Sequence, residues 1–138
     1  MKQTSKRFNL ATRGSGFTDI TDDVRRFVSQ AGIAAGLVTL FLPHTSASLL
    51  IQENADPDIL RDLEAAFCRL APRNAEYLHS TEGPDDMPAH IRSSLTQSSL
   101  SIPVENGAPT LGVWQAIYLF EHRDAPHCRT LVLHVIGE

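Results

Sequence analysis

Apolar residues, in short runs or alternating with polar ones, predict six strands along the chain. The first has Phe8 and Leu10 on one face and suits the edge of a sheet, closed by turn-forming residues 13–16. A turn is expected at 105–108, and the last two strands are expected to pair antiparallel with each other. The predicted strands span residues 6–11, 37–42, 48–52, 100–104, 113–121 and 130–136.

Two segments have the apolar spacing of substantial helices. From Thr21, a plausible N-cap, a stripe runs through Val24, Phe27, Val28 and Ala31 to Gly32. The second helix opens at Asp56 and Pro57, which suit the N-cap and the first turn. Its apolar stripe consists of Ile59, Leu60, Leu63, Phe67 and Leu70.

Residues 73–88 have no period and concentrate His, Asp, Glu, Gly and Pro, so they are expected to form a long functional or mobile loop before a short helix at 89–95. Strands joined by hairpins and only two main helices predict an α+β fold, a two-layer sandwich with a mostly antiparallel sheet. We expect one domain over residues 1–138, because the chain has no linker or internal repeat.

Composition narrows the functional classes. A content of 42% hydrophobic and 20% charged residues is typical of a globular protein, and the net charge of −4 disfavours nucleic-acid binding. No apolar run approaches the roughly 20 residues of a membrane span, and no apolar run follows the basic N-terminal residues. We therefore expect a cytoplasmic protein with no membrane partner, whose Cys68 and Cys128 stay reduced.

Histidines at the ends of predicted elements suggest a metal site. His79 and His90 flank Asp85 and Asp86, and His44 follows a buried strand. Imidazoles with carboxylates can bind a divalent ion and leave a position open. The 11-residue spacing from His79 to His90 matches no strict zinc signature. The alternative to a metal site is therefore that these are loop histidines held by hydrogen bonds.

The segment 44–48, His-Thr-Ser-Ala-Ser, gathers neutral donors directly after a strand. It predicts either a phosphate cradle or a turn whose hydroxyls bond their own backbone. Asn54 and Glu121 follow apolar runs at the ends of predicted strands. They could belong to an active site, which often lies at strand ends, or they could be solvated strand termini. Gln115, inside an apolar run, needs hydrogen-bond partners if it is buried.

These motifs, with Tyr77-Leu-His79, Asp85-Asp-Met-Pro-Ala-His90 and the signature from Gly107 to Gln115, resemble the YjbQ-like family of secondary thiamine-phosphate synthase enzymes over nearly the whole chain. The resemblance implies a YjbQ-like α+β fold, a homotrimer, a divalent ion such as zinc or magnesium, and weak thiamine-phosphate synthase activity on small phosphorylated substrates. The chain departs from the usual pattern at Val113, Asp86, Gln97 and His127.

Carried over by position, the resemblance makes His44, His79 and His90 the metal ligands. It makes Asp85 and Glu121, with His90, the catalytic groups of the pocket. Arg129 would meet a phosphate, together with the donors Thr45, Ser46, Asn54 and Gln115.

The leading hypothesis is a metal-assisted condensation of a hydroxymethylpyrimidine diphosphate with a thiazole phosphate, because neighbouring cations stabilise charge on a leaving diphosphate. A metal-dependent hydrolase using the same ligands is one alternative. A non-catalytic trimer that binds a metal or ligand is the other.

Overall fold

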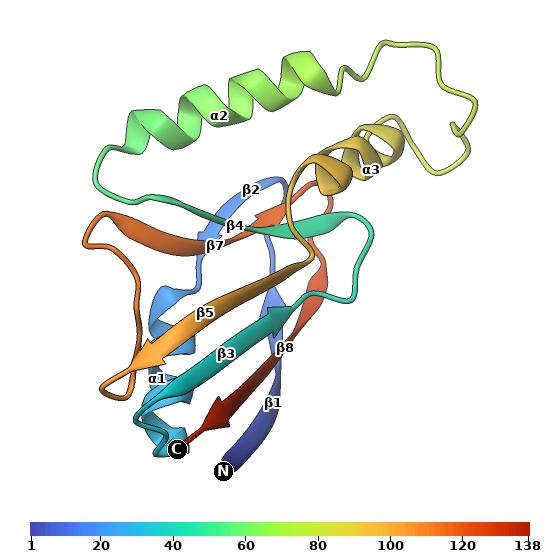
Figure 1. Ribbon diagram of the computed structural model, residues 1–138. Coiled ribbons are helices and arrows are strands. Elements are labelled where there is room, and N and C mark those ends of the chain that lie inside the picture. Colours follow the sequence, from blue (N-terminus) through green and yellow to red (C-terminus); the bar gives the residue numbers. More distant parts are fainter.

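The computed structural model describes residues 1–138 and contains eight strands and three helices (Figure 1). None of the helices is both long and apolar enough to cross a bilayer. In chain order the elements are β1 (Lys2–Ala11), β2 (Gly16–Asp19), α1 (Thr21–Ala31), β3 (Gly36–Phe41), β4 (Ala47–Glu53), α2 (Pro57–Leu70), α3 (Asp86–Leu95), β5 (Ser99–Glu105), β6 (Ala108–Pro109), β7 (Gln115–Glu121) and β8 (Cys128–Gly137).

The strands form two antiparallel sheets, which confirms the α+β class with antiparallel pairing. One sheet has the order β1-β8-β3-β5-β6 and the other the order β2-β7-β4. Strand β1 lies at an edge, as predicted. The predicted pairing of the last two strands is wrong, because β8 pairs with β1 and β3 while β7 pairs with β2 and β4.

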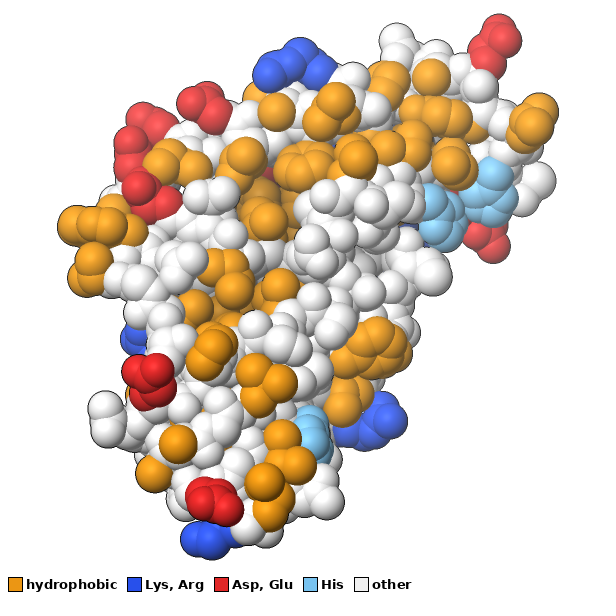
Figure 2. All heavy atoms as spheres, viewed as in Figure 1, with side chains coloured by type: hydrophobic (Ala, Val, Ile, Leu, Met, Phe, Trp, Pro, Cys, Tyr) orange, Lys and Arg blue, Asp and Glu red, His pale blue; other side chains and the backbone are white.

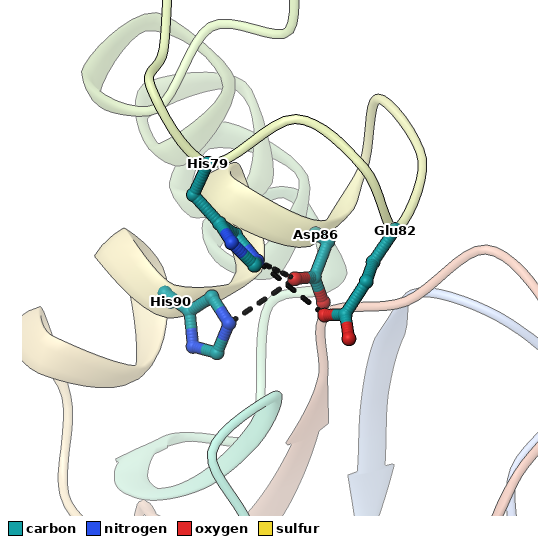
Figure 3. Close-up of side chains that lie close together, drawn as sticks. All are labelled: His79, Glu82, Asp86 and His90. Atoms are coloured by element: carbon teal, nitrogen blue, oxygen red, sulfur yellow. Dashed lines mark hydrogen bonds and ion pairs between the residues drawn. The ribbon is translucent and has the colours of Figure 1, made fainter.

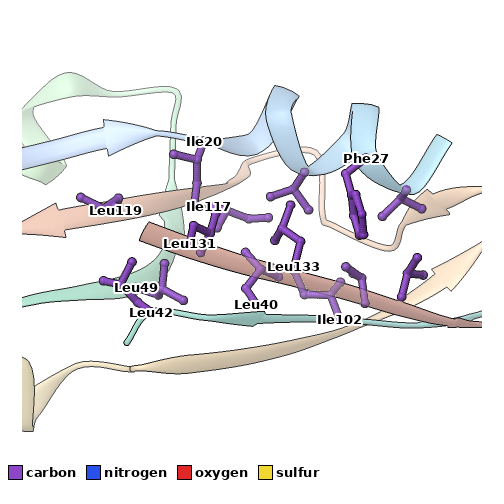
Figure 4. Packing of buried hydrophobic residues seen from close by; sticks show 14 of the residues in the cluster. Ile20, Phe27, Leu40, Leu42, Leu49, Ile102, Ile117, Leu119, Leu131 and Leu133 are labelled. Carbon is purple, nitrogen blue, oxygen red and sulfur yellow. The ribbon is translucent and has the colours of Figure 1, made fainter. Parts of the chain in front are cut away.

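A single apolar core joins the two sheets to α1 (Figure 4). The predicted stripe of α1 supplies Val24, Phe27 and Val28 to this core, and the helix packs against β6, β7 and β8. The alternation in β8 places Leu131, Leu133 and Val135 in the core, each at most 1% exposed. Burying side chains of this size stabilises a fold by roughly 1.5–3 kcal/mol each.

The start of α1 differs from the prediction that Thr21 is its N-cap. Thr21 lies inside the helix, and its N–H and hydroxyl both donate to Asp19. The Thr21 hydroxyl also accepts the backbone N–H of Ile117 in β7. The Thr21 side chain therefore connects the helix to the smaller sheet. Asp19 accepts the backbone N–H of Thr21, which has no partner within the helix. Gly32 ends the helix with φ 65°, as predicted.

The second helix begins as predicted, because the Asp56 side chain accepts the N–H of Asp58 at 2.9 Å. The third begins three residues earlier than predicted and includes Pro88 in its first turn. Proline fits there because the first N–H groups of a helix have no intrahelical partner. The loop is thereby shortened, and Asp86 and His90 come to lie one turn apart on α3.

Two further details concern the strands. Gly16, predicted as the last turn residue, begins the short strand β2, which was not predicted, and β7 begins at Gln115 rather than at residue 113. The turn at 105–108 is confirmed as a two-residue hairpin in which Asn106 and Gly107 have φ values of 51° and 76°. Such left-handed backbone is what Asn-Gly supplies at low steric cost.

Candidate functional site

Four side chains meet at the start of α3 and form what we call the cation cluster (Figure 3). His79 and Glu82 come from the loop before α3, and Asp86 and His90 lie one turn apart on the helix. The Nε2 atoms of His79 and His90 lie 2.5 and 3.2 Å from Asp86 Oδ2. His79 Nε2 lies 3.4 Å from a Glu82 oxygen. One potential ligand atom from each residue lies within 4.8 Å of all the others.

Two arginine contacts hold the acidic end of the cluster. Arg123 donates to Asp86 at 2.6 Å and to Asp85 at 3.0 Å, and Asp85 also accepts the N–H of Asp124. Burial alone would raise the pKa of both aspartates, but hydrogen bonds outweigh it, so both pKa values lie below their ordinary range. The hydrogen bond to Asp86 raises the pKa of His79. The carboxylate of Asp85, predicted to be catalytic, is thus occupied in positioning the segment that carries Asp86.

A hollow of about 680 Å³ lies beside the cluster, and we call it the serine hollow. His90 belongs to both the hollow and the cluster. The hydroxyl of Ser93 is buried without a hydrogen-bond partner and lines the hollow. The lining residues are Phe41, Leu42, Pro43, His44, Thr45, Ser46, Ala47, Ser48, His90, Ser93, Ser94, Ser98 and Arg129. This wall is rich in neutral hydroxyl groups.

One wall of the serine hollow rests on a buried ion pair. Arg129 donates to Glu121 at 2.8 and 2.5 Å, and the two residues are 5% and 1% exposed. Burial would raise the pKa of Glu121, but Arg129 and the Thr12 hydroxyl outweigh it and lower that pKa. Arg129 also donates to Ser46 Oγ at 2.9 Å. Since that oxygen accepts from Arg129, the Ser46 hydroxyl proton is available to a ligand.

His44 lines the serine hollow but lies outside the cation cluster. Its Nε2 accepts the backbone N–H of Thr130 at 2.9 Å. Burial first, and then the charge of Arg129, lowers its pKa. The structure therefore brings two of the three predicted metal-binding histidines together and places the third among the donors of the hollow.

Ser48, which lines the serine hollow, is linked by hydrogen bonds to two side chains that do not line it. The hydroxyl oxygens of Thr96 and Ser48 are hydrogen-bonded at 2.5 Å, and Ser48 Oγ lies 2.8 Å from His122 Nε2. His122 is 2% exposed, and its Nδ1 has no hydrogen-bond partner. Burial, with the nearby charge of Arg92, lowers the pKa of His122 to about 3. This imidazole is neutral at physiological pH.

The low pKa of His122 predicts a pH-dependent term in stability. Between pH 7 and pH 5 an unfolded chain protonates this imidazole and the folded chain does not, so the folded state loses stability as the pH falls. We expect the stability of the wild type relative to His122→Gln to drop by about 2 kcal/mol over that range. Urea unfolding of both proteins at the two pH values measures it. A His122 ring that titrates near pH 6.5 by NMR would contradict the assignment.

Two predicted phosphate-binding residues lie outside the serine hollow. The Gln115 side chain is exposed and accepts the N–H of Gly112 at 2.7 Å. Asn54 is exposed and pairs through its backbone with Trp114. Sequence reasoning missed the roles of Glu82 and Ser93. A carboxylate three residues after His79 was the available signal for Glu82, whereas Ser93 carried none.

The cation cluster suits a divalent ion. Ligand atoms around one zinc ion lie roughly 3–4 Å apart, close to the spacing of these four atoms. Two imidazoles favour zinc or a similar transition ion over magnesium, which prefers oxygen ligands. The contact of Asp86 with Arg123 is the type of supporting hydrogen bond that orients a ligating carboxylate.

Comparison with protein families places nearly the whole chain in one group. Residues 6–138 match the family described as "UPF0047 protein YjbQ-like". A UPF0047 protein of Synechocystis is 51% identical over 94% of this chain and 88% of its own length. The UPF0047 protein YjbQ of Escherichia coli O157:H7 is 40% identical over 96% of this chain and 97% of its own length.

Solved structures share the fold. A YjbQ/UPF0047 protein from Clostridium acetobutylicum superposes with a TM-score of 0.87 at 37% identity, covering 95% of this chain and 99% of its own. A hypothetical protein from Aeropyrum pernix superposes with a TM-score of 0.88 at 29% identity, covering 98% of this chain and 99% of its own. A YbjQ-like protein of unknown function from Sulfolobus solfataricus gives 0.87 at 20% identity, which supports the fold alone.

Proposed function

Because the chain belongs to the YjbQ-like UPF0047 family, and because its cation cluster adjoins a hydroxyl-lined hollow, we propose that it is a cation-assisted transferase for small phosphorylated substrates. The specific reaction we propose is the condensation of a hydroxymethylpyrimidine diphosphate with a thiazole phosphate. One observation carries the proposal. His90 is shared by the cluster and the hollow, so a charged leaving group in the hollow lies next to the ligands of a cation.

The hollow offers hydroxyl donors to phosphate oxygens. Ser93 has an unpaired buried hydroxyl there, and Ser46 has its proton free because its oxygen accepts from Arg129. The charge of Arg129 is balanced by Glu121, so phosphate recognition depends mainly on neutral donors. Aligned hydroxyl donors in a partly closed site stabilise developing negative charge with little reorganisation.

The proposed reaction separates charge. A C–N bond forms between the thiazole nitrogen and the pyrimidine methylene carbon, and the C–O bond to the diphosphate breaks with its electron pair leaving on oxygen. A divalent ion, when bound, supplies positive charge beside that leaving group. His79, Glu82, Asp86 and His90 would hold it, and Arg123 orients Asp86. The serine hydroxyls hold the diphosphate against His90 while the bond breaks.

The proposal is tested by incubating purified protein with both substrates and Zn²⁺ or Mg²⁺. Thiamine phosphate and inorganic diphosphate should form in equal amounts. Chelation of the ion should stop the formation of both products. No product with either ion, from protein that binds zinc, would overturn the transferase assignment.

A hydrolase is the second candidate, because a site of imidazole and carboxylate ligands suits activation of water by zinc. Release of phosphate or diphosphate from one substrate alone, with no condensed product, distinguishes it. A metal- or ligand-binding trimer without turnover is the third. Binding of zinc and substrate with neither reaction would favour that role.

We also propose that the chain assembles as a homotrimer. Helix α2 carries an apolar stripe but has no buried residue. Apolar side chains gather over α2 and the surface below it in Figure 2. Exposed large side chains elsewhere include Phe41 at 44%, Leu95 at 55% and Trp114 at 62%. A contiguous exposed apolar patch, such as the one over α2, is typical of surfaces that bind another protein. Phe41 lines the serine hollow, so a neighbour seated there would help to close it.

Light scattering should give a mass of about three times the 15.2 kDa of one chain. Introducing a charge by Phe41→Lys should shift the protein towards monomer, because a desolvated lysine without a partner is costly at an interface. Arg61→Gln on α2 is the control, because it changes an exposed charged side chain without removing an apolar contact. A monomer at micromolar concentration would refute the trimer.

A further inference from the structure

A second, smaller hollow of about 290 Å³ lies where the end of α2 and the following residues approach α3. We call it the Arg92 hollow. It is lined by Cys68, Ala71, Pro72, Arg73, Asn74 and Arg92, and so contains two guanidinium groups, one amide and no carboxylate. Residues two apart on a helix differ by about 200°. Arg92 therefore faces away from His90 and Ser94, which line the serine hollow.

Arg92 is a buried cation without a counter-ion. It is 8% exposed, its Nε has no hydrogen-bond partner, and its one side-chain hydrogen bond is from Nη2 to Cys68 Sγ at 3.4 Å. Arg129 is buried to the same degree, yet it makes an ion pair with Glu121 and donates to Ser46. The two residues show that this fold pairs one buried arginine fully and leaves the other open.

An unpaired buried charge is costly, and an arginine presents donors in a fork that matches oxyanions. Arg73 places a second guanidinium at the rim, but its two Nη atoms donate to the two carboxylate oxygens of Asp124, so the uncompensated charge of the hollow is that of Arg92. Asn74 supplies an amide. In a protein of net charge −4 this is a local positive site, which favours a ligand of opposite charge.

We propose that the Arg92 hollow binds a small oxyanion, such as phosphate or a carboxylate, on the guanidinium of Arg92. This site is separate from the proposed substrate site. Its volume accommodates a phosphate or a small carboxylate. Its wall contains no acidic side chain that would repel an anion.

Two cysteines allow the site to be tested in the unaltered protein. Cys68 lines the Arg92 hollow and Cys128 lies at the start of β8, and both are free and exposed. The two thiols are alkylated with iodoacetamide, a neutral reagent, at increasing inorganic phosphate and, separately, acetate. We expect the rate at Cys68 to fall about 10-fold at a concentration nine times Kd, while the rate at Cys128 stays constant.

Arg92→Met should abolish the protection of Cys68. Arg92→Lys, which keeps the charge but not the fork, should weaken it and serves if the methionine variant fails to fold. Protection by phosphate but not acetate identifies a tetrahedral ligand, and the reverse identifies a carboxylate. An unchanged rate at Cys68 with both anions would overturn the proposal, as would protection that persists in Arg92→Met or occurs equally at Cys128.

Discussion

Replacing His90 with alanine is expected to lower zinc affinity and condensation activity together, each by at least about 100-fold. Loss of a residue that only supports a ligand costs 10–100-fold in affinity or activity, and loss of a ligand itself should cost more. His90 also lines the serine hollow, so the alanine removes a contact with the substrate as well. Isothermal titration with Zn²⁺ and a product assay at saturating ion measure the two effects.

His134→Ala is the matched control, because His134 contacts Gln3 on the neighbouring strand and lies in neither site. It should retain wild-type affinity and activity. Unchanged melting of the His90 variant would show that the fold is intact, since its ring is partly exposed. His90→Ala protein that binds zinc as tightly as the wild type would remove the cation cluster from the proposal.

Glu121→Gln is expected to destabilise the fold by about 3–5 kcal/mol, the largest stability effect among the changes considered. The substitution leaves Arg129 charged and buried without its counter-ion. It also weakens the acceptor for Thr12 and for the backbone N–H groups of His122 and Arg123. Denaturant unfolding at pH 7 measures the loss.

The stabilisation of the fold by Glu121 should decrease as the pH falls, because the pKa of this carboxyl group is lowered in the folded protein. The stabilisation by ionised Glu121 is fully present above the pKa of the unfolded chain and is lost as the pH falls through its lower folded value. The wild type and Glu121→Gln should therefore converge in stability in acid. Asp58→Asn breaks an exposed pair with Arg61 and should cost less than about 1 kcal/mol. A similar small loss for Glu121→Gln would show that the buried pair adds little.

Helix and strand positions were predictable wherever one face of an element is buried. The stripe of α1 and the alternation of β8 both matched the core, and Asp56 capped α2 as its chemistry predicts. The start of α3 was missed because a proline interior to a helix looks like a breaker, and only the first turn tolerates it. Strand pairing was missed because alternation fixes which side chains are buried but not which strand lies beside which.

The α+β class, most of the elements and the histidines and hydroxyls at their ends could be predicted from the local pattern of residues. Which of these groups meet depends on how the elements pack. Helical spacing brings His90 under Asp86, and the loop folds His79 and Glu82 onto them, while a backbone contact holds His44 in the serine hollow. The packing also distinguishes the two buried arginines, since Arg129 in β8 pairs with Glu121 in β7 of the other sheet and Arg92 has no carboxylate partner. Propensity acts over a few residues, whereas ligand sets and ion pairs depend on distances set by the packing of the whole chain.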